Sequence, residues 1–113
     1  MKITPKGTKT KNTILFYGIE LLEEFGLHGV TFTALNNRFN ISSQHVTYYF
    51  GSVENFRNQV AELAVDCAGL QPVAVAHLIL CGHPATHRLS AETKKFIFES
   101  ALFLVEMEPV PTL

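Results

Sequence analysis

Five polar side chains lie close together between Ser43 and Tyr48, and their types suit binding to nucleic acid. They are Ser43, Gln44, His45, Thr47 and Tyr48. Gln pairs bidentately with adenine, Ser hydrogen-bonds to several bases, and the hydroxyl groups of Thr and Tyr bind phosphate oxygens. Backbone amides at the start of a helix also attract phosphate. The segment therefore contains a candidate surface for contact with DNA.

Two short helices separated by a tight turn are predicted to position these side chains. Thr31 can cap the first helix, whose apolar positions lie on one side. These positions are Phe32, Leu35 and Phe39. Asn40 tolerates the left-handed backbone conformation that ends this helix, and Ser42 can cap the second, which buries Val46 and Phe50. In a helix-turn-helix module the second helix enters the major groove, with its N-terminal residues against base edges.

Further helices are predicted on both sides of this pair. An amphipathic pattern from Ile14 to Phe25 predicts a helix that Thr10 or Thr13 caps and Gly26 ends. After Gly51, the expected helices run from a Ser52 cap to Cys67, over residues 73–81, and from a Ser90 cap to about Glu106, with Gly69 and Pro72 at the first break. Because no segment alternates like a strand, we predict an all-α fold. Its parts are a flexible basic arm (residues 1–10), a helix-turn-helix domain (11–57) and a short helical region (58–113).

Composition favours a single folded domain. The chain has 113 residues, of which 47% are hydrophobic and 17% charged, a balance typical of a protein with one core. Its formal net charge is −1, but basic residues outnumber acidic ones as far as Arg57. Two cysteines without a signal-peptide pattern indicate a reducing compartment, so we expect a cytoplasmic protein. The apolar runs VAVAHLILC and FIFESALFLV fall short of the ~20 residues of a membrane span, and none is expected.

A second set of residues suggests metal binding. It comprises His77, Cys81, His83 and His87. Imidazole and thiolate are zinc ligands, and His77 with Cys81 forms an i, i+4 pair on one helix face. We favour a structural interpretation, with Cys81 in the core and His77 hydrogen-bonded, because the spacing matches no defined ligand loop. No phosphate loop, nucleophile elbow or close carboxylate pair is present, so neither enzymatic activity nor a cofactor is predicted.

Residues 11–57 carry a series of apolar and polar signals at fixed spacing. The first helix contains Ile14-Leu15, Tyr17-Gly18, Leu21-Leu22 and Gly26, and Thr31 follows. The second part reads NISSQHVTYYFGSVENF, with Ile41, Ser42, Val46, Tyr49, Phe50, Ser52, Glu54 and Phe56 in register. This series resembles the DNA-binding domain of the TetR family of transcriptional regulators. The resemblance implies a four-helix DNA-binding head and a dimeric regulator.

The chain departs from the family pattern in two respects. Thr47 replaces a Tyr, and Val53 replaces a Lys that contacts phosphate, so the grip on the DNA backbone is expected to be weaker. The region after Arg57 is also much shorter than the ligand-binding and dimerisation domain of the family.

The last predicted helix is apolar around most of its circumference, which favours association with a second copy. Its apolar residues are Phe96, Ile97, Phe98, Ala101, Leu102, Phe103, Leu104 and Val105.

Together these patterns predict a TetR-like regulator that binds double-stranded DNA as a homodimer and represses transcription. The candidate DNA-binding residues are Lys9, Lys11, Thr31, Thr33, Ser43, Gln44, His45, Thr47, Tyr48 and Tyr49. An alternative is a protein-interaction module, in which a degenerate head no longer binds DNA and the apolar C-terminal helices pair with a partner regulator. A small apolar effector between the last helices is a further hypothesis.

Overall fold

Helices account for the regular secondary structure throughout the part of the chain that the structure describes, residues 5–67 and 71–107. The structure is a computed structural model. Its α-helices are α1 (Pro5–Phe25), α2 (Phe32–Phe39), α3 (Ser43–Phe50), α4 (Val53–Asp66), α5 (Pro72–Leu80) and α6 (Ala91–Met107). Two short 3-10 helices, η1 (Leu27–Gly29) and η2 (Pro84–Arg88), join them. The predicted all-α class is confirmed.

The predicted helix boundaries between Thr31 and Ser90 are largely confirmed, because local hydrogen bonds set them. The hydroxyl oxygens of Thr31, Ser42, Ser52 and Ser90 each accept the backbone N–H three residues later, at 3.0 to 3.3 Å. Such bonds satisfy donors that have no partner within the helix. Asn40 leaves α2 with φ 57° and ψ 38°, in the left-handed region. The helix-turn-helix spacing of α2 and α3 follows from these caps.

Two predictions about the first helix are wrong. Residues 5–10 belong to α1, so most of the expected flexible arm is helical, and neither Thr10 nor Thr13 caps a helix start. Pro5 is the first residue of α1, where the missing N–H costs no hydrogen bond. The Thr13 hydroxyl instead donates to the carbonyl oxygen of Lys9 inside the helix, at 2.9 Å.

At the other end of α1, Phe25 is the last residue of the predicted apolar pattern, and its side chain is 59% exposed. Residues 1–4 and Gly69 lie outside the described residues.

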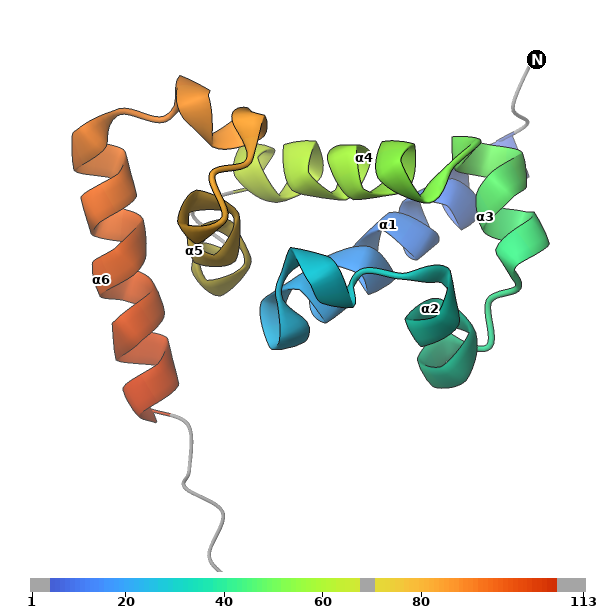
Figure 1. Cartoon of the computed structure of the whole chain (residues 1–113), viewed down its shortest axis with the longest axis horizontal. Helices are drawn as coiled ribbons and strands as arrows, with labels where there is room; N and C mark the ends of the chain where they lie inside the picture. The colour runs from blue at the N-terminus through green and yellow to red at the C-terminus, as the bar shows by residue number, and fades with distance from the viewer. Residues whose placement is uncertain (1–4, 68–70, 108–113) are drawn as a thin grey trace, which may run out of the picture.

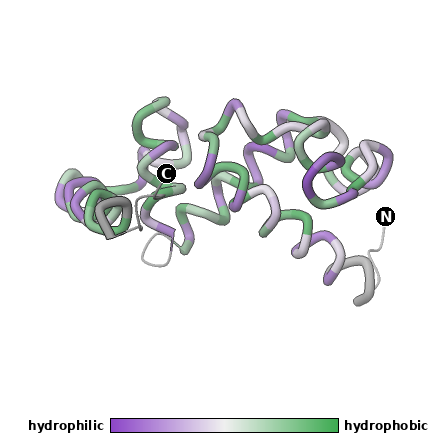
Figure 2. Tube along the Cα trace, turned by 90° about the horizontal axis from the view of Figure 1, so that it is seen from below, coloured by the Kyte–Doolittle hydropathy of each residue, from purple (hydrophilic) through white to green (hydrophobic). Residues whose placement is uncertain are grey.

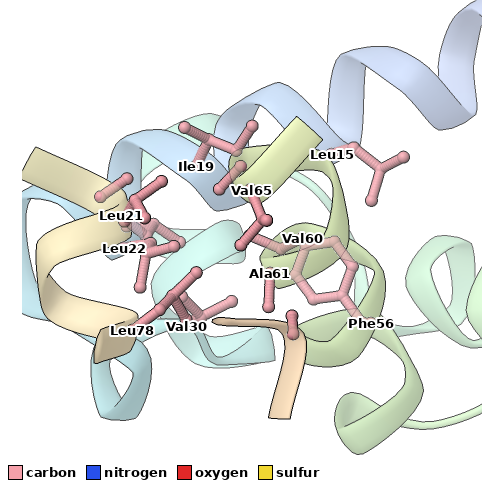
Figure 3. Packing of buried hydrophobic residues seen from close by; sticks show 14 of the residues in the cluster. Leu15, Ile19, Leu21, Leu22, Val30, Phe56, Val60, Ala61, Val65 and Leu78 are labelled. Carbon is pink, nitrogen blue, oxygen red and sulfur yellow. The ribbon is translucent and has the colours of Figure 1, made fainter. Parts of the chain in front are cut away.

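The core lies where α1 crosses α4 and α5. Leu21 and Leu22 of α1 and Phe56 and Val60 of α4 are fully buried, and Leu78 of α5 closes the same cluster (Figure 3). In Figure 1, α2 and α3 stand at one end of the molecule and α6 at the other, with α5 between α6 and the rest. The polar surface of α3 and the apolar helix α6 are therefore well separated in space.

α6 packs mainly against one other helix. Its main packing partner is α5, against which Ile97 and Ala101 are buried. Figure 2 shows that the trace of α6, at the edge of the molecule, carries both hydrophobic and hydrophilic stretches. Among the described helices, none is both long enough and apolar enough to cross a bilayer.

Candidate nucleic-acid interface

α3 presents its polar residues on one side and inserts its apolar residues into the core on the other. Val46 and Phe50, one turn apart, are 0% and 3% exposed. Five other side chains of α3 are exposed: Ser43, Gln44, His45, Thr47 and Tyr48. Helical periodicity places Ser43 with Thr47 and Gln44 with Tyr48 as i, i+4 neighbours. Two adjacent polar rows thus cover the outer surface of α3.

Hydrogen bonds hold α3 at both ends. Before it, the N–H of Ile41 donates to the carbonyl oxygen of Leu35, at 3.3 Å, which closes the turn from α2. After it, Nδ2 of Asn55 donates to the carbonyl oxygen of Phe50, at 2.6 Å. The Phe50 ring lies 4.9 Å from the Phe56 ring, between centroids, and so joins α3 to α4. The orientation of the polar rows is therefore determined by the packing beneath them.

The two tyrosines of α3 differ in their surroundings. Tyr48 is 60% exposed, whereas Tyr49 is half-buried and packs against the core. Their rings meet edge to face, with centroids 4.9 Å apart. Tyr48 can extend away from the protein, while Tyr49 lies at the border of the candidate surface.

The N-terminal turns of α2 and α3 meet around a shallow polar hollow of about 320 Å³. It is lined by Phe32, Thr33, Asn36, Ser42 and Ser43. The hollow brings Thr33 next to the polar rows of α3. Thr31 contributes differently, because its hydroxyl oxygen caps α2 by accepting the Ala34 N–H. Asn36 also lines the hollow, although it is not among the candidate residues predicted from the sequence. Because Asn36 is three residues after Thr33 on α2, the two side chains lie on the same side of that helix.

Two lysines of α1 lie near the helix-turn-helix. Lys9 is exposed and lines a groove with Tyr17 and Ile41, and Ile41 belongs to the turn before α3. The Lys11 ammonium lies 5.5 Å from the centroid of the Phe50 ring, at the C-terminal end of α3. A cation above an aromatic face is attracted to the ring electrons. Both lysines are therefore carried by a helix rather than by a flexible arm.

Two polar contacts that the sequence does not reveal support the helix-turn-helix formed by α2 and α3. The Arg57 Nε donates to the carbonyl oxygen of Val30, at 2.8 Å, and ties α4 to the segment before α2. Arg38 of α2 forms an ion pair with Glu24 of α1. Both pairs are far apart in the chain, so no local pattern indicates them. They stabilise the position of α2, which in turn supports α3.

The histidines and cysteines form separate contacts. His77 Nε2 lies 3.1 Å from the Glu23 carbonyl oxygen, and His83 Nε2 lies 3.1 Å from Asn58 Oδ1. Within the described ranges, no three His, Cys, Asp or Glu side chains are placed to hold a metal ion. Cys81 is exposed, so its predicted place in the core is wrong, because α5 ends at Leu80 and the chain turns away there.

An open apolar hollow of about 160 Å³ lies between α5 and α6. Its lining residues are Val73, Ala76, His77, Leu80, Phe98, Ala101 and Leu102. Two of them are strongly exposed, Leu80 at 74% and Leu102 at 62%. Sites that enclose small ligands have volumes of roughly 300–1,000 Å³. The hollow is therefore smaller than a typical effector site, and its rim is open.

Comparisons of the chain with protein-family models, with curated proteins and with solved structures find no match.

Proposed function

We propose that this protein binds double-stranded DNA through α3, as a TetR-like, sequence-specific transcriptional repressor. The observation that carries the proposal is the division of α3 into a buried apolar side and an outer side of two polar rows. Val46 and Phe50 fix the helix, so Ser43 and Gln44 stand outward at its N-terminal end. These are the positions from which a recognition helix contacts base edges. Gln44 then selects bases, with adenine as its best partner.

The surroundings of α3 supply contacts for the DNA backbone. Lys9 and Lys11 of α1 offer positive charge beside the helix-turn-helix, and Thr33 and Thr47 are exposed. Phosphate contacts of this kind set the orientation of a protein on the duplex without reading sequence. Because α1 is helical from Pro5 onward, the two lysines have a defined spacing on one rigid element. We therefore assign base selection to α3 and backbone contact mainly to α1 and α2.

Selection from random-sequence duplex DNA, followed by sequencing, tests this assignment. The wild-type protein should enrich a motif with two-fold symmetry at both low and near-physiological salt. Gln44→Ala should change the preferred bases. Lys9→Ala with Lys11→Ala should weaken binding to every sequence and reduce the salt slope by at most about 2, because each phosphate contact releases about one counterion.

The matched control removes two lysines from the opposite end of the molecule. Lys94→Ala with Lys95→Ala changes the net charge equally, but these residues lie on α6. This variant should keep the wild-type salt slope and motif. The assignment is wrong if the wild-type protein enriches no motif, or if the α6 variant loses as much affinity as the α1 variant.

The apolar surface of α5 and α6 supports a homodimer. Five large apolar residues are exposed there: Leu80 (74%), Phe96 (65%), Leu102 (62%), Phe103 (61%) and Leu104 (44%). At these fractions each phenylalanine exposes on the order of 100 Å². The five together expose roughly 500 Å², which is within the ~300–600 Å² of the largest apolar patch on a typical monomer and is a large part of the ~800 Å² that each partner buries in a stable complex.

Helical spacing separates this surface into two flanks. Phe98 and Leu102 line the hollow beside α5, whereas Phe96 and Phe103, seven residues apart, share the other flank. We infer that a second copy covers these flanks by packing α6 against α6. The alternative is that a different protein covers these flanks, as expected if the chain is a protein-interaction module.

Mass measurement in solution distinguishes the two occupants. The wild-type protein should be a dimer, and Phe103→Glu should be a monomer, because it buries a charge in the interface. Glu20→Gln, at an exposed position on α1 and outside the proposed interface, should remain a dimer. A wild-type monomer, with no symmetric DNA motif, would instead favour the partner-binding function.

A further inference from the structure

Both ring nitrogens of His83 are engaged, and together their partners select one protonation state. Nδ1 accepts the backbone N–H of Ala85, at 3.0 Å. An N–H can only donate, so Nδ1 carries no proton. In the neutral ring the proton is therefore on Nε2, which donates to Oδ1 of Asn58, at 3.1 Å. The neutral Nε2–H form satisfies both partners at once.

These bonds attach η2 to α4. His83 is the residue before η2 and caps it, while Asn58 lies on α4. The Thr86 hydroxyl donates to the His83 carbonyl oxygen, at 2.7 Å, and both Ala85 and Thr86 are buried. The position of His83 is thus fixed from three directions.

Arg88 makes a second attachment at the other end of η2. Its Nη2 lies 2.9 Å from Glu62 Oε2, 2.9 Å from Asp66 Oδ1 and 3.2 Å from the Glu62 carbonyl oxygen, all on α4. The chain then continues into α6. The connection to α6 is therefore held on α4 by the ionic contacts of Arg88 and by the contact of His83.

We propose that His83 is a pH-sensitive latch that holds η2, and with it the entry to α6, against α4. Protonation of Nδ1 removes the acceptor for the Ala85 N–H and places two N–H groups opposite each other. The cap of η2 is then lost, although Nε2 can still donate to Asn58. The ionic contact of Arg88 remains, so acidification loosens one end of η2 before the other.

The charged groups around His83 act in opposite directions. Burial of the ring is the largest effect and lowers the pKa of His83, the Glu62 carboxylate raises it, and charged His87 lowers it. The other charged groups at this contact are Arg88 of η2 and Asp66 of α4, which form an ion pair with each other. The net result is a pKa below the ordinary histidine value of about 6.5. The neutral latch is therefore the form that predominates in the folded protein near neutral pH.

The direction of the pH effect follows from linkage. Because the unfolded chain binds a proton at His83 more readily than the folded one, stability rises with pH in this range. The contribution of the latch is complete above about pH 6.5 and is lost as the pH falls through the lowered folded-state pKa. The effect needs no DNA and is independent of the proposed recognition surface.

Urea unfolding at pH 7.5 and 5.5 tests the latch with two matched variants. His83→Asn keeps a side chain that caps helices well but does not titrate. His87→Asn removes an exposed histidine four residues away. The urea midpoint of the wild-type protein and of His87→Asn should fall on acidification, and that of His83→Asn should fall less. Equal falls in wild type and His83→Asn would overturn the proposal.

Nuclear magnetic resonance of the wild-type protein gives a second, independent test. The Ala85 amide and the His83 ring should titrate with a common midpoint below about 6.5. An Ala85 amide shift that does not follow the ring would also overturn the proposal, whether or not the variants fold.

Discussion

Gly18 lies where α1 crosses α4, and replacing it by alanine tests this contact directly. A Cβ atom at this position would lie 2.5 Å from Val60 Cγ2 and 2.9 Å from Phe56 Cζ. Both of these side chains are 0% exposed, so neither has free space to move into. The overlap should cost about 1–3 kcal/mol, as added volume in a packed core usually does.

The intrinsic preference of helices for alanine acts in the opposite direction. Within a helix, alanine is more favourable than glycine by about 1 kcal/mol. We therefore expect Gly18→Ala to lower the free energy of unfolding by up to about 2 kcal/mol when both effects are combined. For a domain of this size, 1 kcal/mol corresponds to a change in Tm of about 4 °C.

Urea and thermal unfolding, followed by circular dichroism, provide the assay. Asn12→Ala, at an exposed position on the same helix, controls for helix propensity and should leave stability unchanged or slightly raised. Val60→Ala removes Cγ2, so Gly18→Ala should cost less in that background than in wild type. If Gly18→Ala is more stable than wild type by the ~1 kcal/mol of helix preference alone, or changes stability equally in both backgrounds, α1 and α4 do not approach as closely as described.

Substitutions at three further positions test a turn, a helix cap and the ion pairs by the same unfolding assay. Asn40→Ala should destabilise by about 1–2 kcal/mol, since alanine is strained in the left-handed conformation, whereas Asn40→Gly should not; equal losses would contradict this. Ser42→Ala should cost about 1 kcal/mol through the lost cap of α3, and an unchanged midpoint would rule out that cap. Arg88→Ala should cost no more than about 1 kcal/mol, because its 48% exposed side chain is screened by solvent, and the cost should shrink at high salt.

Short-range signals were sufficient to predict the helix-turn-helix arrangement. The caps at Thr31, Ser42 and Ser52 and the left-handed Asn40 involve atoms within a few residues of each other. Burial of Val46 and Phe50 follows from their i, i+4 spacing. The start of α1 was predicted wrongly, since the polar residues before Asn12 lack the apolar period on which the prediction depends.

The candidate interface depends on both kinds of information. The outward direction of Gln44 and Tyr48 follows from the period of α3, and the sequence is sufficient to infer it. The position of Lys11 over the Phe50 ring and the meeting of Thr33 with Ser43 required the tertiary structure. These contacts depend on how separate helices cross.

The same distinction holds for the chain as a whole. Its periodicity, caps and turn residues specify which segments are helical, because a helix is stabilised mainly by contacts between residues three or four positions apart. The partner of His83 lies 25 residues away on another helix, and the exposure of Phe103 depends on α6 having α5 as its main neighbour. Such features arise only when the apolar faces of distant segments pack together, since packing, and not local preference, decides which side chains meet and which remain uncovered.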